Sequence, residues 1–162
     1  MSVYTVAMKD GTIIASADLV IIHTDSTLAT AGSNISILRA WCNQGATETS
    51  EQLGIQLCLQ ASAFGTYTAA TPRPHFIGGK ISGIVGATTG AEGTAGVDAS
   101  ANAAGTKTEI IAEGFNNLNG WSYIPTPEER IILPPDTAIV LAMIGTASVL
   151  SNWYAGITYE EI

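Results

Sequence analysis

The residues EQLGIQLCLQ at 51–60 alternate between large apolar side chains and small or polar ones. Because successive side chains of a β-strand point to opposite faces of a sheet, this period of two predicts a strand. One face carries Leu53, Ile55, Leu57 and Leu59, and the other carries Gly54, Gln56, Cys58 and Gln60. We expect the first face to lie in a core and the second to face water or an interface.

Six further segments have the alternating or β-branched residues of strands, bounded by turn residues. They are SVYTVAM (2–8), DLVIIH (18–23), NISILRAWCN (34–43), TKTEIIAE (106–113), TAIVLAMI (137–144) and NWYAGITYE (152–160). Within them, Trp41 alternates with Ile35 and Ile37, and Trp153 alternates with Ile157, so both tryptophans suit a core. No window of helical length has a sustained helical apolar period.

This pattern predicts an all-β fold, an antiparallel β-sandwich. Since about eight strands suit two four-stranded sheets, a jelly roll is the first choice and an immunoglobulin-like sandwich the second. Residues 1–162 are expected to form a single domain, long enough for a core without disulfides or metal. Segment 78–105, rich in Gly and Ala, is expected to be a loop or arm, either mobile or laid over a neighbouring subunit.

The chain carries little charge. Charged residues make up 12% of the sequence, against about 25% in ordinary soluble domains. Because a free monomer normally needs more charge to stay dispersed, part of the surface is expected to be buried in a homo-oligomer. The net charge of -8 and the scattered basic residues argue against a nucleic-acid partner.

The sequence contains none of the residue spacings that mark known catalytic or metal-binding motifs. Cys42 and Cys58 lack CxxC or His spacing and are interpreted as small buried thiols. His23 ends an apolar strand and is interpreted as a strand-end histidine with its hydrogen bonds satisfied, while His75 belongs to the loop TPRPHF. We therefore expect no enzyme activity, no cofactor and no metal.

Signals for export or membrane insertion are also missing from the sequence. The start MSVYTVAMKDG lacks a basic segment followed by an apolar one, so no signal peptide is expected. The longest nearly apolar run, at 137–150, is shorter than the about 20 residues that span a bilayer. We expect a soluble protein that is made in the cytoplasm.

The segment WSYIPTPEERI at 121–131 is crowded with aromatic, proline and charged residues. Trp121 and Tyr123 lie two apart, which places both rings on one face of an extended chain. The prolines at 125 and 127 exclude a regular helix and stiffen the segment. We expect a rigid arm whose aromatic half is buried, either docked at a subunit boundary or serving as a corner within the domain.

Charged side chains of this arm and of the TPRP loop are the candidate interface residues. Glu128, Glu129 and Arg130 are expected to make polar contacts at a subunit boundary, and Arg73 is a candidate interface anchor. The two glutamates are neighbours on an extended segment and point apart, so a glycosidase-like acid pair is not expected. A salt link to Arg130 or Arg73 is the preferred account.

The segments GWSYIPTPEERIIL (120–133), TPRP (71–74) and ITYEEI (157–162) together resemble a family of small structural proteins of tailed bacteriophages and prophages. The resemblance implies a virion protein assembled in the host cytoplasm, namely a jelly-roll head decoration or cement protein. It also implies self-association, with a trimer favoured, binding to the major capsid protein or another virion protein, and no enzyme activity.

The alternative is a receptor- or carbohydrate-binding component of the tail or fibre, because sandwich folds serve there too. That function predicts exposed aromatic rings beside Asp, Asn or Gln in a groove. The stretch FNNLNGWS at 115–122, with Trp121, is the candidate for such a groove.

Overall fold

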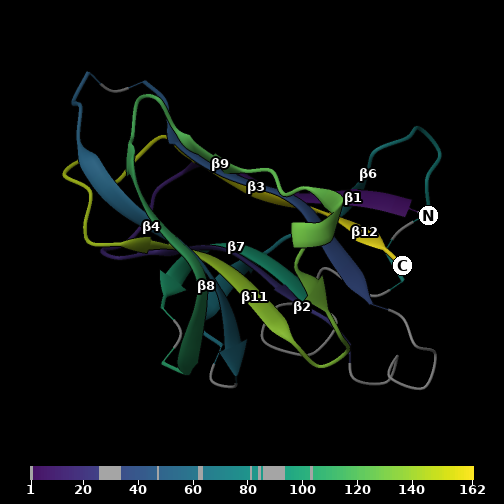
Figure 1. Ribbon diagram of the computed structural model, residues 1–162. Coiled ribbons are helices and arrows are strands. Elements are labelled where there is room, and N and C mark those ends of the chain that lie inside the picture. The colour runs from purple at the N-terminus through teal and green to yellow at the C-terminus, as the bar shows by residue number, and fades with distance from the viewer. Residues whose placement is uncertain are drawn as a thin grey trace.

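A computed structural model describes residues 2–25, 34–46, 48–61, 64–80, 82–83, 85, 94–102 and 104–162. Two antiparallel sheets pack face to face as a sandwich (Figure 1). Within these ranges the helical structure consists of the single 3-10 turn η2, Pro127–Glu129. The predicted all-β sandwich is confirmed.

Within the described residues, each sheet has six strands. Sheet A has the order β10 (Ile132–Leu133), β3 (Ile35–Gln44), β12 (Trp153–Glu161), β1 (Ser2–Gly11) and β6 (Arg73–Pro74), and β9 (Trp121–Tyr123) also pairs with β3. Sheet B has the order β5 (Thr66–Ala69), β7 (Thr94–Ala101), β2 (Asp18–His23), β11 (Ala138–Ile144), β4 (Gln52–Ala61) and β8 (Thr106–Asn116).

The connectivity is that of a jelly roll. The chain alternates between the sheets from β1 to β4, and eight strands pair as β1-β12-β3-β9 in one sheet and β2-β11-β4-β8 in the other. The first two strands of an immunoglobulin-like sandwich share a sheet, whereas β1 and β2 here lie in different sheets. The remaining strands β5, β6, β7 and β10 extend this eight-stranded framework at its edges.

The main core fills the space between the sheets. Its largest fully buried side chains include Trp153, Tyr4 and Tyr159, and the two tyrosine rings stack with centroids 5.6 Å apart. The predicted apolar face of β4 also points here, since Ile55 and Leu57 belong to this cluster. Burial of large apolar side chains is the dominant stabilising term in such a sandwich.

A second, smaller cluster lies apart from the main core. It contains Cys58, Val140 and Tyr67, so the face of β4 that was expected to meet water or an interface is instead buried within the chain near Cys58. Beside this cluster the fully buried carboxylate of Asp18 accepts a hydrogen bond from the Tyr67 hydroxyl and forms an ion pair with Lys107. A buried carboxylate needs such partners to remain charged.

Two further sequence-based expectations were wrong in detail. Trp41 lies on the outer face of sheet A, because a bulge inserts Leu38 between the pairs Arg39–Thr158 and Ile37–Tyr159 and reverses the alternation. Segment 78–105 is not a loop throughout, since residues 94–101 form β7 between β5 and β2. Residues 81, 84, 86–93 and 103 of that segment lie outside the described residues.

Candidate interaction surface

The arm, defined as residues 121–131, begins at a tight turn after β8. Gly120 has φ of +72°, a left-handed conformation that suits glycine, and its amide donates to the Asn116 carbonyl at 2.9 Å. Trp121 follows immediately and is only 8% exposed. Its indole nitrogen donates to Glu113 on β8 at 2.7 Å. The predicted burial of the aromatic half is thus confirmed at Trp121, and Tyr123 is half-buried.

The tip of the arm is held by its own hydrogen bonds. The Tyr123 hydroxyl donates to the Glu129 carbonyl at 2.9 Å, and the Thr126 hydroxyl donates to the Glu129 carboxylate at 3.1 Å. Burial is the main cause that raises the pKa of the Tyr123 phenol, so it remains a hydrogen-bond donor at neutral pH. The tip is a 3-10 turn rather than the extended segment expected, and Glu128 and Glu129 both remain exposed on it.

The base of the arm is fixed to sheet A. Arg130 pairs with Glu160 of β12 at 3.8 Å, and the Ile37 amide donates to the Ile131 carbonyl at 2.9 Å. The predicted salt link of the glutamates to Arg130 is not formed within the chain, because Arg130 pairs with Glu160 instead. The alternative link to Arg73 stays a prediction. The Nε atom of Arg130 is buried without a partner among the described residues.

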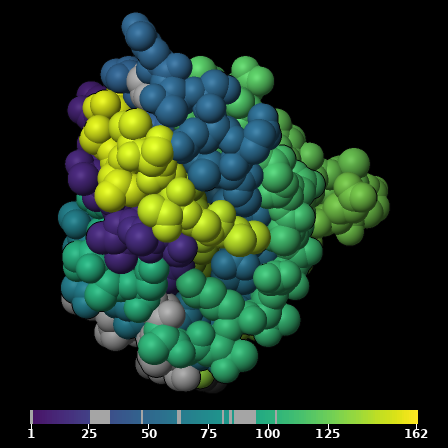
Figure 2. Space-filling view, turned by 90° about the vertical axis from the view of Figure 1, so that its left-hand side faces the viewer, coloured from purple at the N-terminus to yellow at the C-terminus, as the bar shows by residue number. Residues whose placement is uncertain are grey.

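The arm is exposed and partly apolar. Ile124 at its centre is 70% exposed and Ile132 beyond it is 47% exposed. In Figure 2 the light-green segment around residues 125–130 projects from the side of the molecule opposite β1, which is purple. The arm thus presents apolar and acidic side chains on a pre-ordered support.

Arg73 lies at the other edge of sheet A. It sits on β6, which pairs with β1 only at Tyr4 and Thr5. Its side chain lines a hollow of about 360 Å³ together with Ala7, Ala69, Ala70, Val97, Thr5 and Thr71. Among the described residues that line this hollow, Arg73 is the only charged one. Within the described residues it has no ion-pair partner.

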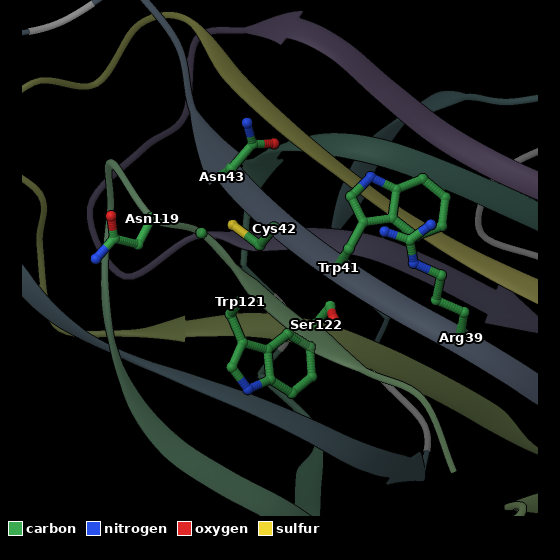
Figure 3. A pocket seen from close by; sticks show the side chains of 8 residues that line it. Arg39, Trp41, Cys42, Asn43, Asn119, Trp121 and Ser122 are labelled. Carbon is green, nitrogen blue, oxygen red and sulfur yellow. The ribbon is translucent and has the colours of Figure 1, made fainter. Parts of the chain in front are cut away.

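A shallow groove of about 420 Å³ lies on the outer face of sheet A, over β3 and β9 (Figure 3). Trp41, Asn43, Asn119 and Ser122 line it, so it has the polar groups that the sugar-binding alternative predicts. The Arg39 guanidinium lies 5.0 Å above the Trp41 ring, and a Cβ at Gly156 would come within 2.3 Å of that ring. The ring is therefore largely covered, and Trp121 is buried.

The remaining candidate residues, two cysteines and two histidines, do not lie together in one site. Cys42 lies in sheet A and Cys58 in sheet B, and both are free and buried as expected. His23 is buried at the end of β2, 3.6 Å from Asp136, but its Nδ1 has no partner in the described part of the chain, so it is only partly satisfied. His75 directly follows β6, and its Nε2 atom lies 2.6 Å from the Thr5 hydroxyl.

The described residues contain neither a cluster of metal ligands nor a membrane-spanning helix. No group of three or more His, Cys, Asp or Glu side chains is placed to hold a metal ion in this part of the chain. The same residues include no helix long and apolar enough to span a bilayer.

The sequence identified the arm residues as a candidate interface, but it did not predict which residues surround Arg73. The small residues Ala69, Ala70 and Val97 that line its hollow gave no signal, because alanine-rich segments resemble loops in composition. Ile124 was not predicted as an interface residue either. Its place between aromatic and proline residues on a stiff arm is a sequence signal for an exposed apolar side chain.

Comparisons with protein-family models, with curated proteins and with solved structures found no match to this chain.

Proposed function

We propose that this protein is a non-enzymatic structural component of a tailed-phage virion. In this role it is a capsid decoration or cement protein that self-associates, as a trimer in the favoured case, and binds the head shell through the major capsid protein or another virion protein. The resemblance of residues 120–133, 71–74 and 157–162 to phage structural proteins supports this class.

The observation that carries the proposal is the projecting arm. Ile124 is 70% exposed on a segment that prolines, the Tyr123 and Thr126 hydrogen bonds and the Arg130–Glu160 pair hold in one shape. A pre-ordered arm loses little conformational entropy on docking, so it is suited to subunit contacts. The low share of charged residues, 12%, also favours burial of surface against other subunits.

The test has two parts. Light scattering measures the mass of the purified protein, and a trimer has three times the subunit mass of 16.7 kDa. Cosedimentation with empty phage heads then tests binding to the shell. An oligomer that pellets with heads supports the proposal, whereas a monomer that stays in the supernatant contradicts it.

The groove over β3 and β9 favours a second candidate function, a receptor- or carbohydrate-binding tail component. Asn43, Asn119 and Ser122 offer hydrogen bonds to a sugar there, although the ring of Trp41 is largely covered. A glycan array probed with the labelled protein tests this function. Binding that is lost in Asn119→Ala would support it, and an array without any signal would reject it.

A further inference from the structure

The hollow around Arg73 combines an apolar lining with one cation that has no ion-pair partner in the described part of the chain. Ala7, Ala69, Ala70 and Val97 supply apolar surface, and the hydroxyls of Thr5 and Thr71 lie beside them. The β6 strand pairs with β1 only at Tyr4 and Thr5, so the edge of β1 at Ala7 is left open to this hollow. An open sheet edge beside an apolar depression is a site where another chain can bind.

The arm has the complementary surface. Ile124 and the flanking prolines are apolar, and Glu128 is an exposed anion with no ion-pair partner in the described part of the chain. Glu129 is different, because its carboxylate already accepts hydrogen bonds from Thr126. Glu128 is thus the acidic side chain of the arm that is available to a cation on another molecule.

The two surfaces lie at opposite edges of one sheet. The arm leaves from β9 and enters β10, which both pair with β3, while Arg73 lies on β6 beyond β1. A single copy therefore cannot bring its own arm to its own hollow. The arm of one copy can reach the hollow of another copy that is related to it by a rotation. Such a contact joins two unlike surfaces head to tail, and it closes into a ring when successive rotations return to the first copy.

We propose that the arm of one copy docks into the Arg73 hollow of the next. Ile124 enters the alanine-lined depression and Glu128 pairs with Arg73, while the prolines keep the arm from adding as a regular strand. This inference rests on the proposed self-association and names the surfaces that carry it.

Charge exchange tests the pairing. Arg73→Glu and Glu128→Arg are each expected to weaken self-association at least about tenfold, because each places like charges together. The double variant again places opposite charges together, with the two signs exchanged. It is expected to recover most of the lost self-association. Lys80→Glu and Glu48→Arg are the charge-matched controls, since both residues are exposed and neither lines the hollow nor belongs to the arm.

Disulfide trapping tests the geometry independently. Positions 73 and 128 lie at opposite edges, so a disulfide between them must join two copies. A mixture of Arg73→Cys and Glu128→Cys is expected to give a cross-linked dimer under oxidation, while Glu128→Cys alone gives none. The native Cys42 and Cys58 are buried and do not compete.

The outcomes separate the two proposals. A wild-type monomer that ignores phage heads overturns the proposed function. A wild-type oligomer whose mass is unchanged by either reversal, or whose loss the double variant does not repair, leaves that function in place and overturns the docking of the arm at Arg73. Circular dichroism of each variant confirms that the fold is intact before its association is compared.

Discussion

The indole Nε1 of Trp121 donates a 2.7 Å hydrogen bond to the Glu113 carboxylate, and this bond joins β9 of one sheet to β8 of the other. Trp121 is therefore both the first residue of the arm and a link between the sheets.

Replacing Trp121 with alanine removes this link and leaves a cavity. Trp121→Ala is expected to lower the free energy of unfolding by about 3–5 kcal/mol, as measured by urea denaturation. Glu113→Gln keeps an acceptor for the indole and is expected to cost less than about 1 kcal/mol. Ser122→Ala, on the exposed side of β9, is the control and should stay within about 0.5 kcal/mol of the wild type. A wild-type midpoint for Trp121→Ala would contradict its structural role.

Gly156 is predicted to be required beneath Trp41. A Cβ there would lie 2.3 Å from Cζ2 of the indole, so Gly156→Ala is expected to destabilise the fold by about 1–3 kcal/mol in the same denaturation assay. Gly114→Ala is the matched control, because its Cβ would meet only the Leu53 carbonyl at 3.9 Å. In a Trp41→Ala background the penalty of Gly156→Ala should shrink, and an undiminished penalty would exclude the clash as its cause.

The ion pair of Lys107 with Asp18 should be sensitive to the loss of one partner. Lys107→Met leaves the fully buried carboxylate without its cation and is expected to cost about 3 kcal/mol. Adding Asp18→Asn removes the buried charge and should recover part of this loss in urea denaturation. Tyr67→Phe deletes one hydrogen bond to Asp18 and should cost about 1 kcal/mol. A double variant as unstable as the sum of its parts would contradict the coupling.

The two cysteines should be inert in the folded protein. Burial raises the pKa of the Cys58 thiol to about 11 and raises that of Cys42 as well, so neither forms much thiolate at pH 8. Mass spectrometry after iodoacetamide treatment is expected to find no label on the native protein and two labels after denaturation. Native labelling at the rate of a free cysteine would contradict the burial of that thiol.

Stability should also depend on Glu51 in acid. Its carboxylate accepts the Ser148 amide at 3.0 and 3.1 Å, and hydrogen bonding to Ser148 lowers its pKa. The stabilisation is therefore fully present above the pKa of an unfolded glutamate and is lost as the pH falls through the lowered value. Urea midpoints measured between about pH 6 and pH 3 should fall less steeply for Glu51→Gln than for the wild type. Glu48→Gln, an exposed control, should follow the wild-type curve.

The long strands of the fold were predictable because their side chains alternate. All seven expected strands are present, with ends displaced by only a few residues. The strands that were missed are either two to four residues long, such as β6 and β9, or made of small residues, as β7 is (TAGVDASA). A pattern of small side chains does not distinguish a strand from a loop, and β7 is recognisable only through its pairing with β2 and β5.

The candidate interface was predictable in part. Prolines and aromatic residues are local signals, so the arm was identified from sequence, and Trp121 is buried as expected. The bulge at Leu38 depends on pairing across strands, and it moved Trp41 from the expected core to the surface. The meeting of Arg130 with Glu160, which are 30 positions apart in the chain, likewise depends on tertiary structure.

The separation of the arm and the Arg73 hollow also gives any row of joined copies a polarity. In the proposed contact, a copy with Arg73→Glu keeps its arm but lacks the hollow that receives the next arm, so a ring that includes this copy cannot close. In the proposed assembly, a minor fraction of such copies would leave a larger fraction of the rings open, so this substitution is expected to act as a dominant inhibitor rather than as a simple loss of function.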